Sequence, residues 1–165
     1  MSQLRHRLVR STFTRPADTT QYGAKDVITD ATSGMVNRVF SDVVPENGGS
    51  GKIISMRFTK DDDDNTASTF RLYLYHIDPT AIADNLAYTL LDADKAKRFA
   101  WLDMVAADFI GIGDSDANEA YYKDFVIPFQ CAGNNKDLYG VVVNLSTYTP
   151  ASAEKFQIEL GIDKA

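Results

Sequence analysis

Two segments in the first half of the chain, residues 48–58 and 70–77, alternate hydrophobic and polar side chains. The predicted core-facing positions are Ile54, Met56, Phe58, Phe70, Leu72 and Leu74. The outward positions of the second segment are Arg71, Tyr73 and Tyr75. Because the side chains of a strand point alternately to its two faces, both segments are predicted to be half-buried antiparallel strands. The acidic stretch between them, residues 60–65, is too charged to enter a core.

Short hydrophobic segments bounded by turn-forming residues continue along the chain. They predict further strands at residues 22–28, 35–40, 98–105, 122–130, 138–145 and 156–162. Residues 133–137 are predicted to close a hairpin between two of these strands. Helical spacing of hydrophobic residues within 82–91, followed by residues 92–97, predicts one or two short helices. Eight or nine short strands indicate an all-β fold, an antiparallel β-sandwich that is jelly-roll-like.

Length and composition favour one folded domain. A chain of 165 residues can bury a single core, and 44% hydrophobic residues argue against disorder. Residues 1–20 are predicted to form an extended N-terminal arm, and residues 21–165 the sandwich domain. Residues 1–15 contain four arginines and no acidic residue, so the net charge of −6 arises elsewhere. This acidic balance predicts no nucleic-acid partner, and no apolar stretch predicts a membrane span or secretory signal.

Few residues point to chemistry. The histidines are His6 and His76, and Asp78 is near the second, but no serine is placed beside them as a hydrolytic triad requires. Two histidines and one cysteine far apart do not predict a zinc site. Cys131 follows the hydrophobic segment 125–129 and is expected to be a small buried residue. We therefore expect no enzyme activity and no cofactor.

Calcium is the remaining metal to consider. Asp114, Asp116 and Asn118 place oxygen atoms at alternate positions, as an EF-hand loop begins. The pattern then fails, because Glu119 stands where glycine is needed and Phe125 where the bidentate glutamate belongs. These residues, like the aspartates at 61–64, are expected to be solvated loop residues and only weak calcium candidates.

The outward-facing Arg71, Tyr73 and Tyr75 allow three interpretations. Flat aromatic side chains stack on sugars, whereas tyrosine and arginine are also enriched in protein interfaces. The third interpretation is a second packed face of the sandwich. The sequence leaves all three open.

The order of several segments resembles a family of small virion proteins of tailed bacteriophages, several of which cement or decorate the capsid. The motifs lie at residues 22–28, 48–55 (Gly-Gly-Ser-Gly-x-Ile-x-Ser), 70–79 (ending in Asp-Pro), 85–94 and 138–143 (Leu-Tyr-Gly-Val-Val-Val). The resemblance covers roughly residues 20–162 and implies a jelly-roll-like sandwich that assembles into a small symmetric oligomer, for which we expect a homotrimer. It also implies synthesis in the host cytoplasm, binding to the major capsid protein and a place on the outer capsid surface of the virion. It carries no catalytic residues, and the basic arm and four-aspartate loop depart from the family pattern.

The arm offers a mechanism for attachment. Its predicted capsid-binding residues are Arg5, Arg7, Val9, Arg10 and Phe13, the arginines pairing with acidic patches and the other two anchoring in apolar ones. An arm that orders on docking buries area at an entropic cost, so deleting residues 1–15 is expected to weaken attachment and leave the domain folded. The alternative function is a carbohydrate- or receptor-binding module of a phage head or tail fibre, in which the outward tyrosines contact glycans.

Overall fold

The computed structural model describes residues 6–30, 37–61, 68–112 and 117–164. Its strands are β1 (His6–Thr14), β2 (Val27–Ile28), β3 (Arg38–Phe40), β4 (Ser50–Asp61), β5 (Phe70–Tyr75), β6 (Arg98–Met104), β7 (Ile110–Gly111), β8 (Ala117–Gln130), β9 (Leu138–Asn144) and β10 (Lys155–Lys164). The helices among the described residues are α1 (Asp92–Lys95) and the 3-10 helix η1 (Ala106–Asp108).

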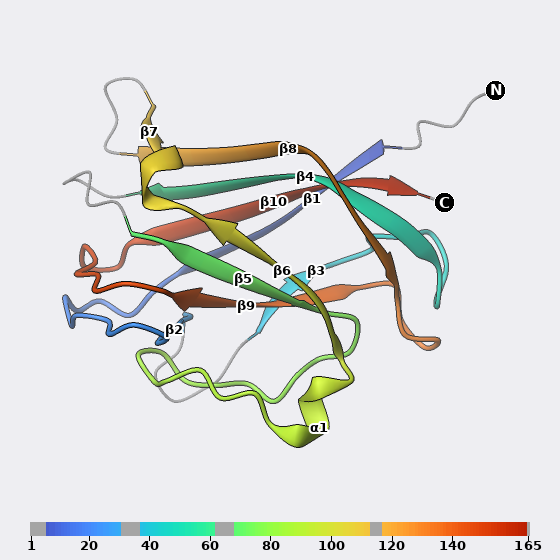
Figure 1. The fold of residues 1–165 in the computed structure, drawn as a ribbon, viewed down its shortest axis with the longest axis horizontal. Helices are drawn as coiled ribbons and strands as arrows, with labels where there is room; N and C mark the ends of the chain where they lie inside the picture. Colours follow the sequence, from blue (N-terminus) through green and yellow to red (C-terminus); the bar gives the residue numbers. More distant parts are fainter. Residues whose placement is uncertain (1–5, 31–36, 62–67, 113–116, 165) are drawn as a thin grey trace.

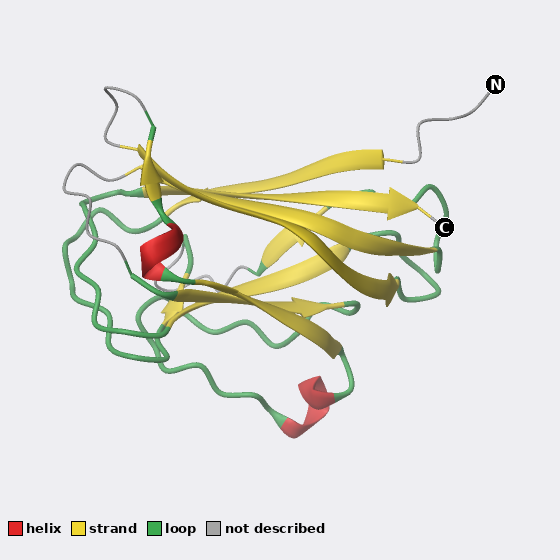
Figure 2. Cartoon of the chain, turned by 45° about the horizontal axis from the view of Figure 1, so that its top comes forward, coloured by secondary structure: helices red, strands yellow, loops and turns green. Residues whose placement is uncertain are grey.

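The strands form two antiparallel sheets that pack face to face (Figures 1 and 2). The first sheet has the order β1-β10-β4-β8-β7, and the second β2-β9-β5-β6 with β3 also paired to β9. The pairs β1–β10, β3–β9, β4–β8 and β5–β6 are nested, as they are when one long antiparallel ribbon is rolled up. That nesting is the jelly-roll arrangement, and it confirms the predicted fold class.

The core lies between the sheets and is rich in phenylalanine. The rings of Phe58 and Phe70 stack with centroids 5.3 Å apart, and Phe156 lies 5.8 Å from Phe58. Five of the six predicted core positions are completely buried, the exception being Ile54. A β-bulge between Ile53 and Ser55 shifts the alternation by one residue, so Ile53 enters the core and Ile54 is only half-buried.

β1 corrects the expectation for the N-terminal segment. It pairs with β10 from His6 to Thr14, and Val9 and Phe13 are buried in the core. Without β1, the backbone edge of β10 would lose its hydrogen-bonding partner, and the core would lose the side chains of Val9 and Phe13. Residues 6–14 therefore belong to the sandwich and not to an arm.

Two connections differ from the sequence prediction. Residues 133–137 join β8 in the first sheet to β9 in the second, so they cross between layers and close no hairpin. Residues 80–91, hereafter the cover segment, are not helical; they run along the outer side of the second sheet as far as α1 (Figure 1). Their backbone bonds to that of the β2 region, with Val27 N–H donating to Leu86 O at 2.9 Å, and these bonds replace helical ones. The short helix expected after them is confirmed as α1.

A charged residue enters the interior where none was expected. Lys60, at the edge of the acidic stretch, is completely buried, and its ammonium lies 3.9 Å from the buried carboxylate of Glu154. The Tyr148 hydroxyl donates to the same carboxylate at 2.5 Å. A buried charge is tolerated when it is paired and hydrogen-bonded, and this arrangement provides both.

Candidate functional site

The outer face of the second sheet is largely covered by the chain itself. Val27, Tyr75, Val141 and Val143 form a second buried cluster there, packed against side chains of the cover segment. Tyr75 is only 1% exposed, and its hydroxyl lies 2.6 Å from that of Tyr88. The surface contact expected of Tyr75 is therefore corrected, because the cover segment already occupies that position.

The cover segment ends before β6, and a group of side chains beside it is partly or largely exposed. Hereafter the aromatic patch, it comprises Arg71, Tyr73, Arg98, Trp101 and Asp103. Trp101 is 54% exposed and lies across from Tyr73 in the β5–β6 register, while Arg71 lies across from Asp103. The residues predicted to face outward on β5 thus meet three residues of β6 (Arg98, Trp101 and Asp103) that the sequence did not single out.

Contacts within the aromatic patch hold its side chains in place. The Arg71 guanidinium donates to both Asp103 carboxylate oxygens, at 2.5 and 2.8 Å, and this pairing raises the pKa of Arg71. The same guanidinium lies 5.7 Å from the Trp101 ring centroid and 5.6 Å from that of Tyr73. Arg98 lies 5.0 Å from the Tyr73 ring, and Tyr73 stacks on Tyr88 at 4.4 Å. Cation–π contacts of this kind contribute about 0.5–1 kcal/mol each at exposed sites.

Among the described residues, no segment covers the outer face of the first sheet, hereafter the bare face, in a comparable way. One row across it consists of Arg10, Glu159, Arg57 and Tyr121 on adjacent strands. Glu159 accepts a hydrogen bond from Arg10 Nε at 2.5 Å, and the Arg57 guanidinium lies 5.4 Å from the Tyr121 ring.

Three large apolar side chains protrude from the same sheet. Leu8 is 60% exposed, Tyr121 52% and Val126 62%. Val126 points away from the core because Phe125 and Ile127 on either side of it pack inward. Exposed apolar side chains on one sheet face, set among arginines, have the composition of a protein-contact surface.

The predicted capsid-binding residues separate into three groups. Arg10 lies on the bare face, and Arg7 is half-buried in the same strand. Val9 and Phe13 lie in the core, where Phe13 stacks on Phe156 at 5.1 Å, so their role as external anchors is corrected. Arg5 lies outside the described residues.

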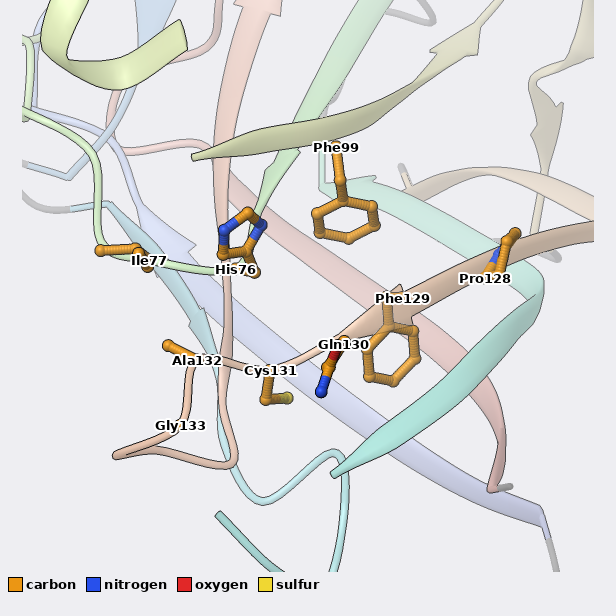
Figure 3. A pocket seen from close by; sticks show the side chains of 9 residues that line it. All are labelled: His76, Ile77, Phe99, Pro128, Phe129, Gln130, Cys131, Ala132 and Gly133. Carbon is orange, nitrogen blue, oxygen red and sulfur yellow. The ribbon is translucent and has the colours of Figure 1, made fainter. Parts of the chain in front are cut away.

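An open pocket of about 640 Å³ lies where the end of β8 approaches the start of β6 (Figure 3). Its aromatic wall is made by Phe99 and Phe129, whose centroids are 6.3 Å apart. His76 lies 6.4 Å from Phe99, and among the described residues its imidazole has no hydrogen-bond partner. Asp78 instead accepts a hydrogen bond from Asn37 at 2.8 Å, so it does not orient the histidine.

Cys131 lies at the edge of this pocket but is buried, as expected. Burial, with a smaller contribution from the charge of Asp137, raises the pKa of its thiol to about 11. A thiol with so high a pKa carries little thiolate at neutral pH, which makes it a poor nucleophile.

The weak calcium candidates are only partly within the described chain. Asp114 and Asp116 lie outside the described residues, and Asn118 is buried in β8. Among the residues that the structure describes, no group of three or more histidine, cysteine, aspartate or glutamate side chains is arranged to hold a metal ion. In the same residues, no helix is long and apolar enough to cross a membrane.

Sequence reasoning also missed a buried polar network at one end of the sandwich. The Tyr22 hydroxyl donates to the Asp84 carboxylate at 2.7 Å and accepts from Arg15 Nε at 2.9 Å. Burial raises the pKa of Asp84, although the backbone N–H of Thr29 also donates to it at 2.9 Å. This network fastens the cover segment to the segment after β1, so we assign it a structural role.

Comparisons with known proteins identify no family. No family model matches the chain, and no curated protein sequence matches it. A chain of the tomato aspermy virus structure is similar at a TM-score of 0.35 and 11% identity, over 100% of this chain and 81% of that one. The K3 adhesin domain of Lys-gingipain from Porphyromonas gingivalis follows at 0.34 and 8%, over 82% and 71%. A chain of deformed wing virus gives 0.31 and 8%, over 99% and 77%. Two of the three come from viruses, but TM-scores this low carry no argument about function.

Proposed function

We propose that this protein is a non-enzymatic structural protein of a tailed-bacteriophage virion. In this role it decorates the outer surface of the capsid as a homotrimer, binding the major capsid protein and stabilising the shell. The sequence motifs that resemble small virion proteins motivate the proposal. The observation that carries it is the bare face, the outer surface of a five-stranded sheet that no described segment covers, whereas the cover segment lies over the opposite side of the sandwich.

The bare face suits attachment to another protein. Leu8, Tyr121 and Val126 supply apolar area. Arg10 and Arg57, which pair with Glu159 and Glu119 on the same sheet, add polar groups among them for hydrogen bonds to the partner. Repeated copies on a lattice make modest contacts collectively strong, so no single contact needs to be large. The jelly roll beneath keeps these side chains in fixed positions, which lowers the entropic cost of docking.

The test is cosedimentation of the purified protein with capsids that lack it. Val126→Glu and Tyr121→Glu are expected to weaken binding by at least about tenfold, because each places a carboxylate in a dehydrated contact. Leu86→Glu is the matched control, since Leu86 is 56% exposed on the cover segment at the opposite side. Equal binding by all three variants, or none by the unaltered protein, would refute the proposal. Light scattering of the free protein tests the trimer separately.

A further inference from the structure

The aromatic patch has features that a structural role leaves unused. Trp101 is the single tryptophan of the chain, and more than half of its surface faces solvent although a large apolar core lies nearby. Among the described residues its indole N–H has no hydrogen-bond partner. An exposed indole does not contribute the stabilisation that a buried tryptophan usually provides. Its exposure therefore indicates a role in ligand binding.

The neighbours of Trp101 indicate the chemistry of that ligand. The Asp103 carboxylate is bound by Arg71 on one side but remains partly exposed, with 37% of the side chain open, and Arg71 is 27% open. A carboxylate accepts and a guanidinium donates, so hydroxyl groups find both partners directly beside the indole ring. A flat apolar surface next to paired donors and acceptors matches a pyranose ring, which has one apolar face and a rim of hydroxyls.

The charges of the aromatic patch indicate which class of sugar it binds. Arg71 is neutralised by Asp103, whereas Arg98, at the other end of the patch, forms no ion pair among the described residues. The patch therefore carries one uncompensated cation in a chain whose net charge is −6. From the outward position of Arg71 to that of Tyr75, opposite Arg98, the strand rises about 13 Å, which gives room for more than one sugar unit.

We propose that the aromatic patch binds a carboxylated glycan, one that contains a sialic or uronic acid. Trp101 stacks on the apolar face of one sugar, Arg71 and Asp103 bond its hydroxyls, and Arg98 pairs with the carboxylate. A protein partner fits less well, because it would bury the partly exposed Arg71–Asp103 pair and incur its desolvation cost. Sugar hydroxyls instead form hydrogen bonds with the exposed atoms of the pair in place of solvent.

The first experiment uses an array of sialylated, uronate-containing and neutral oligosaccharides. We expect carboxylated members to bind the intact protein and Trp101→Ala to lose that binding. Trp101→Phe should retain part of it, because a smaller aromatic ring still stacks. Val126→Ala is the matched control, since it alters an equally exposed side chain on the other sheet and should leave binding unchanged. Absence of glycan binding, or equal binding by Trp101→Ala, would overturn the proposal.

The second experiment uses the fluorescence of Trp101, which reports on this site alone. Acrylamide should quench the free protein efficiently, and a carboxylated oligosaccharide from the array should protect it. The same oligosaccharide without its carboxylate should bind at least about tenfold more weakly, and Arg98→Gln should remove that difference. An indole already shielded in the free protein, equal affinity for both sugars, or protection by capsids but by no glycan would each contradict the assignment. Trp101→Ala should still cosediment with capsids. The proposal of glycan binding at the aromatic patch and the proposal of capsid binding at the bare face can therefore be refuted independently.

Discussion

At the scale of single residues, the environment of a side chain decides its chemistry more than its type does. Cys131 is the one cysteine, and burial raises the pKa of its thiol from 9.0 to about 11. We expect native protein at pH 8 to react with iodoacetamide at least about 100-fold more slowly than protein in urea, because thiolate is the reacting form. Mass spectrometry of timed samples measures both rates. Comparable rates in the two solvents would show an accessible, ionised thiol.

Asp18 illustrates the opposite shift. Its carboxylate accepts hydrogen bonds from Arg15 at 2.8 Å and from the Thr20 N–H at 2.9 Å, which lowers its pKa from 3.8 to about 2. A depressed pKa stabilises the fold above about pH 4, and that contribution is lost as the pH falls towards 2. Asp18→Asn should therefore lower the melting temperature at pH 7, and the difference from the parent should shrink by pH 2.

Thermal melts between pH 7 and pH 2 check the Asp18 prediction. Asp92→Asn, which alters a carboxylate that is 93% exposed, provides the control for general charge effects. A melting-temperature difference that is constant over the whole pH range would assign the loss to packing and not to the titration of Asp18.

At the scale of elements, β1 was predicted to attach the protein to a capsid, but its buried side chains stabilise the fold. Phe13 is 4% exposed, stacks on Phe156 and lies under the Arg38 guanidinium at 4.3 Å. Phe13→Ala is expected to reduce the free energy of unfolding by about 3–5 kcal/mol. Thr12→Ala, on the exposed side of the same strand, should change it by less than about 0.5 kcal/mol. Urea unfolding measures both, and equal stabilities would place β1 outside the folded unit.

The same strand changes the meaning of an N-terminal deletion. Removing residues 1–15 deletes β1, uncovers Phe156 and exposes the backbone edge of β10. Such a truncation should unfold or aggregate, and it cannot test attachment to a capsid. Single changes on the bare face are the informative ones, because they leave the sandwich intact.

The alternation of hydrophobic and polar residues allowed the buried faces of regular strands to be predicted from the sequence. It did not allow β-bulges or the pairing of strands to be predicted. The inward face of β5 followed directly from its period of two, and Phe70, Leu72 and Leu74 are buried as predicted. Ile54 was misplaced because a bulge has no distinct sequence signal. Residues 133–137 have the composition of a hairpin turn. The placement of β9 in the other sheet depends on the fold of the whole chain, which a local pattern does not show. The partners of Trp101 depend on the β5–β6 register, which pattern alone does not fix.

At the scale of the whole molecule, the roll brings the two ends of the described chain together. His6 and Asp163 are paired residues of β1 and β10, so their Cα atoms lie at the spacing of adjacent strands, about 5 Å. Joining the termini with a short glycine-rich linker would turn this non-local pair into a hairpin. New termini opened after Gly133 would lie in the exposed connection between the sheets, where few contacts are lost.

This circular permutant is expected to fold to the same structure with similar stability. The pairing that closes the roll becomes local, so refolding should be faster than that of the parent chain. Circular dichroism, the emission of Trp101 and stopped-flow refolding compare the two chains. A control permutant opened after Val142, within β9 in the centre of the second sheet, should fail to fold. If the permutant opened at Gly133 also failed, the β1–β10 closure would not be a feature of the folded molecule, and the bare face that depends on it would lose its first strand.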